Sequence, residues 1–159
     1  MIRITDQYFW NFVFGLFFVG LVAMSSIILE TEARKSFSEL TVLELVILTL
    51  ATYRFTRLFV NDIITKFFRE QFWDTKESRG QVHLVKPPGG PRRTLADLMA
   101  CPWCFGIWAA ATVLFFYLFT PYADLPVYIL ALGGAATWIH QLAALIGWKA
   151  QQIKEQVER

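Results

Sequence analysis

The chain has 159 residues, of which 55% are hydrophobic and only 18% are charged. Soluble domains usually have about 45–50% apolar and about 25% charged residues, so this composition argues against an ordinary soluble domain. The net charge of +2 is small and gives no indication of a nucleic-acid partner.

Four apolar blocks follow one another along the chain, and each is long enough for a transmembrane helix, which needs about 20 residues. They span residues 8–29, 40–60, 105–122 and 126–148. Four such blocks cannot close a β-barrel, so each must satisfy its backbone hydrogen bonds as a helix. We therefore predict an all-α, polytopic integral membrane protein, with residues 1–159 in a single membrane domain.

The longest polar connection is residues 61–104, between the second and third blocks. Its first part, residues 62–73, alternates apolar and charged side chains at helical spacing, which predicts an amphipathic helix in the lipid headgroup region. Residues 75–93 include a Pro-Pro-Gly-Gly-Pro run and predict an irregular loop. Thr94 and Asp97 have capping-box spacing, which predicts a short helix leading into two cysteines.

The basic residues are distributed unevenly. Thirteen of the fifteen lysines and arginines lie in the terminal segments, near the end of the second block, or in the 61–104 loop, and only Arg34 and Lys35 lie between the first two blocks. Basic residues that flank membrane helices tend to stay in the cytoplasm. We therefore predict a bacterial inner-membrane protein with cytoplasmic N and C termini, a cytoplasmic 61–104 loop and membrane lipids as immediate partners.

Cys101 and Cys104 form a Cys-Pro-Trp-Cys motif directly before the third block. Two thiols at this spacing near a helix N-terminus suit dithiol–disulfide exchange, although no βαβ pattern surrounds them. A metal site would need two more ligands, yet the sequence has no other cysteine and only two histidines, so no resident metal or cofactor is predicted. Alternatively, both cysteines pack as small apolar residues. The reducing cytoplasm argues against a permanent disulfide.

The end of the second block carries four polar side chains on one helical face: Arg54, Arg57, Asn61 and Asp62. The arginines lie within two turns of the inner end, so their side chains can snorkel to phosphate headgroups. Alternatively, they pair with an acid such as Asp62 or Asp97 and fix the cytoplasmic loop to the helices.

The fourth block has two features of its own. His140 lies inside the predicted span, where an ionisable residue is a candidate functional group. No acid accompanies it, so the alternative is a neutral histidine that hydrogen-bonds to a threonine or a carbonyl. Small residues recur at four-residue spacing and predict close contact with another helix; they are Ala131, Gly134, Ala135, Ala143 and Gly147.

The run LATYRFTRLFVNDIITKFFRE, followed by CPWCFGIWAA and a final apolar block, resembles a family of small uncharacterised bacterial and phage membrane proteins. Some members of that family are labelled sporulation proteins. The resemblance covers Leu43 to Gly147 and leaves the first block as an addition. It implies a membrane-embedded fold with the cysteines at the cytoplasmic face, and it implies no activity.

No set of residues forms a recognisable catalytic site. The main hypothesis is therefore a non-enzymatic accessory or structural subunit, which binds another membrane protein or further copies of itself through its aromatic first helix and cytoplasmic loop. One alternative is a membrane thiol-redox or metal-binding protein that uses Cys101 and Cys104. Another is a phage holin-like lysis protein.

Overall fold

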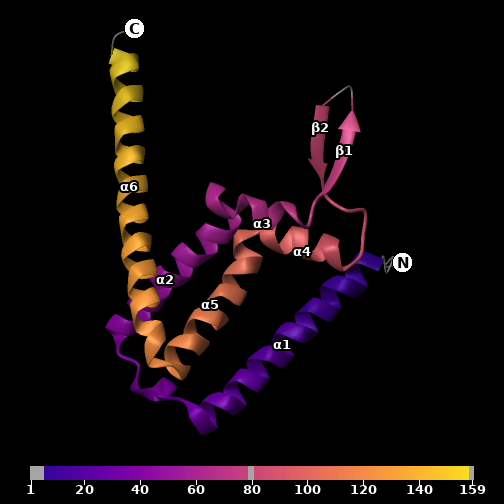
Figure 1. Cartoon of the computed structure of the whole chain (residues 1–159). Helices are drawn as coiled ribbons and strands as arrows, with labels where there is room; N and C mark the ends of the chain where they lie inside the picture. The colour runs from indigo at the N-terminus through magenta and orange to yellow at the C-terminus, as the bar shows by residue number, and fades with distance from the viewer. Residues whose placement is uncertain (1–5, 79–80, 158–159) are drawn as a thin grey trace, which may run out of the picture.

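The computed structural model describes residues 6–78 and 81–157, and this part of the chain is mostly helical (Figure 1). Its elements are α1 (Asp6–Glu32), α2 (Val42–Val60), α3 (Lys66–Glu70), β1 (Asp74–Ser78), β2 (Gln81–Val85), α4 (Pro91–Ala100), α5 (Pro102–Phe119) and α6 (Asp124–Val157). Short 3-10 turns occupy Phe37–Glu39, Ile63–Thr65 and Pro121–Ala123.

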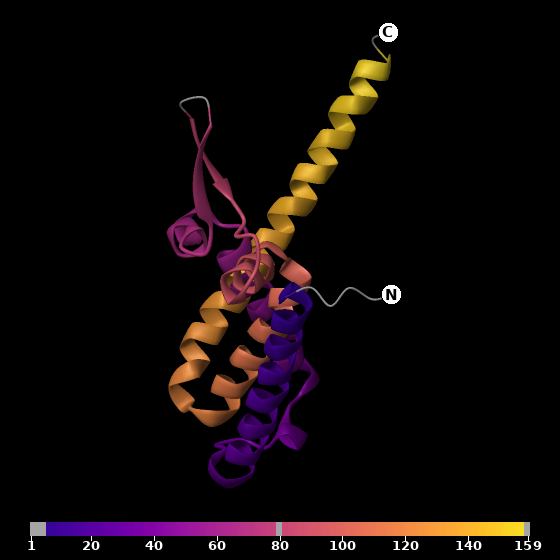
Figure 2. The same cartoon turned by 90° about the vertical axis from the view of Figure 1, so that its right-hand side faces the viewer.

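The four long helices give the molecule two distinct ends (Figure 1). The connections at residues 33–41 and 120–123 lie together at one end, which we call the turn end. The start of α1, α3, the hairpin and α4 lie at the other, the hairpin end. The second half of α6 extends beyond the other helices on that side (Figure 2).

The core is built around α2, which packs against both α5 and α6. Its buried residues are Leu48, Ala51, Val113, Tyr117, Leu118, Val127 and Ala131. A Cβ atom at Gly134 would overlap the main-chain carbonyl of Leu50, so glycine is required where α6 crosses α2. The predicted close packing of small residues is confirmed at Ala131 and Gly134, whereas Ala143 and Gly147 are exposed.

At the turn end, α2 begins with a capping box that the sequence analysis missed. The amide of Glu44 donates to the Thr41 hydroxyl at 3.3 Å, and the amide of Thr41 donates to the Glu44 carboxylate at 2.9 Å. Lys35 lies 2.5 Å from the same carboxylate. Arg34 donates two hydrogen bonds to Asp124 at 2.7 and 2.8 Å, which raise the pKa of the guanidinium above its usual value. Both basic residues of the turn end are therefore ion-paired.

Residues 62–73 form two short helical pieces, and the predicted continuous amphipathic helix is not observed. A 3-10 turn precedes the five-residue helix α3. The Arg69 guanidinium donates to the main-chain carbonyls of Phe59 and Asp62 at 3.1 and 3.2 Å, which folds the segment back against the end of α2. Its exposed apolar side chains are Ile63, Ile64 and Phe67.

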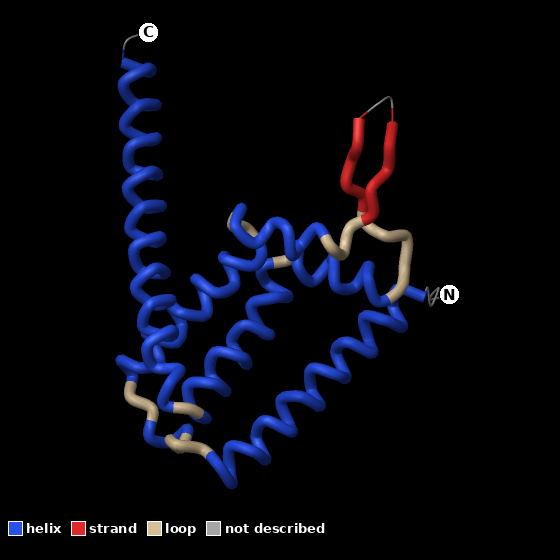
Figure 3. Tube along the Cα trace, viewed as in Figure 1, coloured by secondary structure: helices blue, strands red, loops and turns tan. Residues whose placement is uncertain are grey.

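The irregular loop predicted for residues 75–93 is wrong over its first part, where β1 and β2 pair as an antiparallel hairpin (Figure 3). The register places Asp74 opposite Val85 and Lys76 opposite His83. The polar β1 segment has no alternation of apolar and polar residues, so its extended form depends on pairing with β2 and is not visible in its own sequence.

The short helix predicted before the cysteines is confirmed as α4, but the predicted capping box is wrong. Gly90 precedes the helix with a φ of 84°, a conformation that favours glycine. Pro91 follows as the first helical residue, a position where its missing N–H costs nothing. Thr94 consequently lies inside the first turn of α4, and its hydroxyl makes tertiary contacts.

Within residues 6–78 and 81–157, three segments are long and apolar enough to span a membrane: Asp6–Glu32, Pro102–Phe119 and Pro121–Val157. These correspond to the first, third and fourth predicted blocks, with the last helix continuing to Val157. α2 has 19 residues but carries Glu44, Arg54 and Arg57, so a span at residues 40–60 stays a prediction.

Candidate functional site

A cavity of about 560 Å³ lies between α1, α4 and α5 at the hairpin end. We call it the junction cavity. Its volume falls within the range of about 300–1,000 Å³ typical of small-molecule sites. The apolar lining includes Phe14, Gly15 and Phe18 of α1 and Ile107 and Trp108 of α5; the polar lining comprises Asn11, Lys86, Thr94, Asp97, Cys101 and Cys104.

The aromatic wall connects α1 to α5. The ring centroids of Phe18 and Trp108 are 4.7 Å apart, and those of Phe17 and Trp108 are 6.3 Å apart. Gly15 faces open space, because a Cβ atom there would meet no atom within 4 Å. The cavity therefore exists where α1 presents a glycine and an aromatic side chain to the indole ring of Trp108.

A hydrogen-bonded cluster of Gln7, Asn11 and Thr94, which we call the Thr94 network, attaches the start of α1 to α4. Thr94 is 7% exposed. Its hydroxyl accepts from Gln7 Nε2 at 2.8 Å and donates to Asn11 Oδ1 at 3.0 Å, and Gln7 Nε2 also donates to Asn11 Oδ1 at 3.0 Å. Among the described residues, the Asn11 amide nitrogen donates to no acceptor. Asn11 also lines the junction cavity and is exposed.

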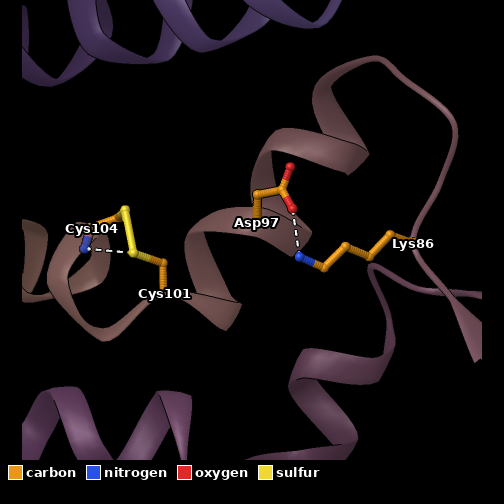
Figure 4. The surroundings of a disulfide bond; sticks show 4 residues. All are labelled: Lys86, Asp97, Cys101 and Cys104. Atoms are coloured by element: carbon orange, nitrogen blue, oxygen red, sulfur yellow. Dashed lines mark hydrogen bonds and ion pairs between the residues drawn. A yellow bond between two sulfur atoms is a disulfide. The ribbon is translucent and has the colours of Figure 1, made fainter.

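A second polar group in the lining is the Lys86–Asp97 ion pair (Figure 4). Lys86 Nζ lies 2.6 Å from Asp97 Oδ1, and Arg93 Nε lies 2.9 Å from Asp97 Oδ2. Burial alone would raise the pKa of Asp97, but the hydrogen bonds from Lys86 and Arg93 outweigh it and hold that pKa below 3.8. Asp97 is therefore ionised at neutral pH. Lys86 Nζ also lies 5.6 Å from the ring centroid of Trp73, which orients the ammonium group.

Cys101 and Cys104 form a disulfide in the cavity wall, at the junction between the end of α4 and the start of α5 (Figure 4). Their Cα atoms are 5.3 Å apart. Cys101 caps α5, and its sulfur accepts the amide of Cys104 at 3.2 Å. A permanent disulfide was not expected in a reducing cytoplasm, but the structure places both cysteines in one. The described residues 6–78 and 81–157 bring together no group of three metal-binding side chains.

Arg54 and Arg57 lie outside the junction cavity. Arg54 forms an ion pair with Asp62 at 2.9 Å, and its side chain lies along Gly133 of α6, where a Cβ atom would be 3.6 Å from Arg54 Cγ. Arg57 donates to the Tyr53 hydroxyl at 3.2 Å, and that hydroxyl donates to Gln141 at 3.0 Å. These contacts tie α2 to α6 and to the chain beyond α2.

The remaining candidate, His140, is exposed on α6 and does not line the junction cavity. Asp97, considered as a partner for the α2 arginines, pairs with Lys86 and Arg93 instead. Gln7, Asn11 and Lys86 were not predicted from the sequence as site residues. The available signal was the pair of amide side chains four residues apart at the start of an otherwise apolar first block.

These features define a small helical protein with membrane-length helices and a disulfide in the wall of a cavity. The chain belongs to the family described as "Protein of unknown function (DUF1360)", whose model matches residues 47–143. This confirms the resemblance noted in the sequence to an uncharacterised family with members labelled sporulation proteins.

Two relatives come from Bacillus subtilis (strain 168). The chain is 37% identical over 97 residues to the UPF0713 protein YngL, a match that covers 60% of this chain and 75% of that protein. It is 31% identical over 108 residues to the sporulation protein YjcA, covering 64% of this chain and 92% of that protein. No solved structure matches the chain.

The family match divides the junction cavity into two parts. Residues 47–143 include α4, α5, both cysteines and Lys86. They exclude α1, and with it Asn11 and the aromatic wall of Phe14 and Phe18. The cavity is therefore closed by a helix that lies outside the matched region.

Proposed function

We propose that this protein is a non-enzymatic accessory subunit of a membrane-protein assembly, anchored by four transmembrane helices. α2 would be a span in addition to the three segments of membrane length, because it packs against both α5 and α6. Its charges are concentrated at its ends: Glu44 lies in the first turn, and Arg54 and Arg57 lie in the last two turns. Ionisable residues near the ends of a span are cheaper to insert than those at its centre.

The proposed orientation places the hairpin end in the cytoplasm of a bacterial inner membrane, together with both termini. The distribution of lysine and arginine supports this orientation. The two basic residues at the turn end pair with Glu44 and Asp124. At the hairpin end, Lys66 pairs with Glu70 at 3.4 Å, but its side chain stays 59% exposed. The exposed Ile63, Ile64 and Phe67 beside it would enter the inner leaflet, with Lys66 at the anionic headgroups.

The observation that carries the accessory role is the exposure of α1. None of its 27 residues is buried, and its outward side chains include Phe12, Leu16, Val19 and Ile27. The helix is nevertheless fixed to α4 through the Thr94 network, so it presents a defined aromatic and aliphatic surface. Because α1 lies outside the family match, we propose that it is the helix with which this chain binds a specific membrane-protein partner.

Site-specific photo-crosslinking in native membranes tests the role of α1. A photoreactive amino acid would be placed at Leu16 and at Ile27, which are 62% and 65% exposed, and at Leu132 of α6, which is 72% exposed, as a matched control. We expect one discrete protein adduct from both α1 positions and none from Leu132. Lipid adducts alone at all three positions, with a monodisperse monomer in mild detergent, would contradict the proposal.

A second candidate function is thiol–disulfide exchange by Cys101 and Cys104. The disulfide in the wall of a ligand-sized cavity favours it. Alkylation trapping in cells would show whether the pair alternates between dithiol and disulfide. A pair that stays in one state under both oxidant and reductant stress would exclude this function. Neither relative is named as a lysis protein, so the comparisons give the holin-like alternative no support.

A further inference from the structure

We propose that the junction cavity binds a lipid-soluble quinone that exchanges two electrons with Cys101 and Cys104. This inference rests on the second function above, thiol–disulfide exchange, and names its redox partner. It combines three features of the cavity: an aromatic wall, a disulfide in the lining, and two side chains, Asn11 and Lys86, that have N–H groups left over for a ligand.

The shape and chemistry of the wall fit a planar ring. Phe14, Phe18 and Trp108 line the cavity, and aromatic side chains favour offset or edge contacts with another flat ring. Of the described helices that are long and apolar enough to span a membrane, two, α1 and α5, line the cavity. A ligand that enters between α1 and α5 would come from the lipid phase. An acyl chain could also enter there, but it would offer no acceptor to Asn11 or Lys86.

The polar lining fits the two carbonyl oxygens of a quinone. Asn11 carries an amide nitrogen that donates to no acceptor among residues 6–78 and 81–157. Lys86 uses one hydrogen for Asp97 and has two more on Nζ. Both side chains line the cavity. Asn11 is exposed and Lys86 is half-buried, so a ligand that supplies carbonyl acceptors would gain hydrogen bonds in the cavity that an alkyl chain cannot make.

The reaction is balanced without any further reactant. The reduced pair loses two S–H bonds and forms one S–S bond. Two electrons and two protons pass to the two oxygens of the quinone, which becomes the quinol. The structure corresponds to the oxidised protein, with the disulfide formed. The amide of Cys104, which donates to Cys101 Sγ at 3.2 Å, would stabilise negative charge on that sulfur during the exchange.

Two glycines of α1 provide a matched pair of variants. Gly15 lines the cavity and Gly20 does not, and a Cβ atom at either position meets no atom within 4 Å. Gly15→Leu would therefore occupy the cavity without displacing its neighbours, and Gly20→Leu adds the same side chain elsewhere on the helix. Full-length protein in lipid nanodiscs would be reduced, freed of reductant and mixed anaerobically with ubiquinone-1. Quinone absorbance and maleimide mass shifts would follow the two half-reactions.

We expect the unmodified chain to form one quinol and one disulfide per protein. Gly15→Leu should slow both at least tenfold, and Gly20→Leu should leave the rate unchanged. Equal rates in the two variants, or disulfide formation without quinol, would overturn the quinone site.

The water-soluble oxidant diamide distinguishes failure of the quinone site from failure of thiol exchange, because diamide should form the disulfide equally in all three proteins. If diamide forms no disulfide in the unmodified chain, thiol exchange fails as well; if only ubiquinone-1 fails, thiol exchange stands and the quinone inference is wrong.

Discussion

α1 and α2 are neighbours in the sequence but are held in the structure by different forces. α2 buries Leu48, Ala51 and Thr56 and packs against α5 and α6 along its length. α1 buries no residue and is attached through the Thr94 network and a few aromatic contacts. Close packing therefore fixes the centre of the molecule, and hydrogen bonds fix its outer helix.

This difference coincides with the extent of the family match. The packed centre of α2, α5 and α6 lies mostly within residues 47–143, and α1 lies outside them. Tight helix packing in a membrane allows few alternative arrangements, whereas a helix that buries no residue keeps side chains available for other contacts. The family match therefore covers most of the scaffold of α2, α5 and α6 and leaves out α1, the helix that we propose binds a partner.

The largest predicted effect comes from the contact between α2 and α6. Gly134→Leu places a side chain against the Leu50 carbonyl, so the helices must separate, and we expect a loss of about 3 kcal/mol or more. Gly147→Leu on the same helix is the control, because a Cβ atom there meets nothing within 4 Å. Unfolding in detergent measures both variants. Equal stability of the two would show that α2 and α6 are not closely packed.

A smaller loss is predicted for Tyr117→Phe, which tests a polar contact of the packed centre. The buried hydroxyl donates to Glu44 at 2.7 Å, and a hydrogen bond to a charged group contributes about 1.5–3 kcal/mol. We expect a loss near the lower limit, since Glu44 keeps its contacts with Lys35 and Thr41. Tyr128→Phe, at a residue that is 44% exposed, should have no measurable effect. Chemical unfolding of both variants is the appropriate comparison.

Thr94→Val should release α1 with little change in the packed centre. The substitution removes the hydroxyl that bonds both Gln7 and Asn11, so amide hydrogen exchange at the start of α1 should accelerate at least tenfold. The free energy of global unfolding should fall by less than about 1 kcal/mol. Thr49→Val, whose hydroxyl bonds only the carbonyl of Leu45 in its own helix, is the control. Unchanged exchange in α1 would mean that other contacts hold it.

The smallest effect concerns pH at the hairpin end. The pKa of Asp97 is lowered in the folded protein, so its ion pairs stabilise the fold above about pH 3.8. That stabilisation is lost as the pH falls through the lower, folded-state pKa. The side chain is 37% exposed, so solvent weakens the effect. Hydrogen exchange of α4 should accelerate in acid in the unmodified chain, and Asp97→Asn should already be faster at neutral pH and lose this acid dependence.

The sequence predicted the helices better than the contacts between them. Long apolar runs are visible without any partner, and α1, α5 and α6 were expected nearly where they occur. The junction cavity was not predicted, because it requires Asn11 and Thr94, far apart in the chain, to meet. The capping box at Thr41 was not predicted. The similar Thr94–Asp97 spacing was, but Gly90 and Pro91 start that helix earlier.

The ion pair between Arg54 and Asp62 was among the interpretations considered from sequence, since the two residues share a helical face. The disulfide was judged unfavourable from the proposed compartment alone. Cys101 caps α5, and this local geometry brings the sulfurs of Cys101 and Cys104 together. The spacing of the two cysteines therefore indicated the disulfide better than the proposed cytoplasmic location did.

The proposed topology depends most on whether α2 crosses the membrane. Two exposed positions, one before α2 and one after it, test this directly. Ser38→Cys and Lys76→Cys would be introduced singly into a chain carrying Cys101→Ser and Cys104→Ser, and intact cells would be treated with a membrane-impermeant maleimide. With four spans and a cytoplasmic hairpin end, position 38 labels in intact cells and position 76 labels only after lysis. Labelling of both positions under the same condition would mean that α2 does not cross, and the reverse pattern would place the hairpin and the disulfide outside the cell.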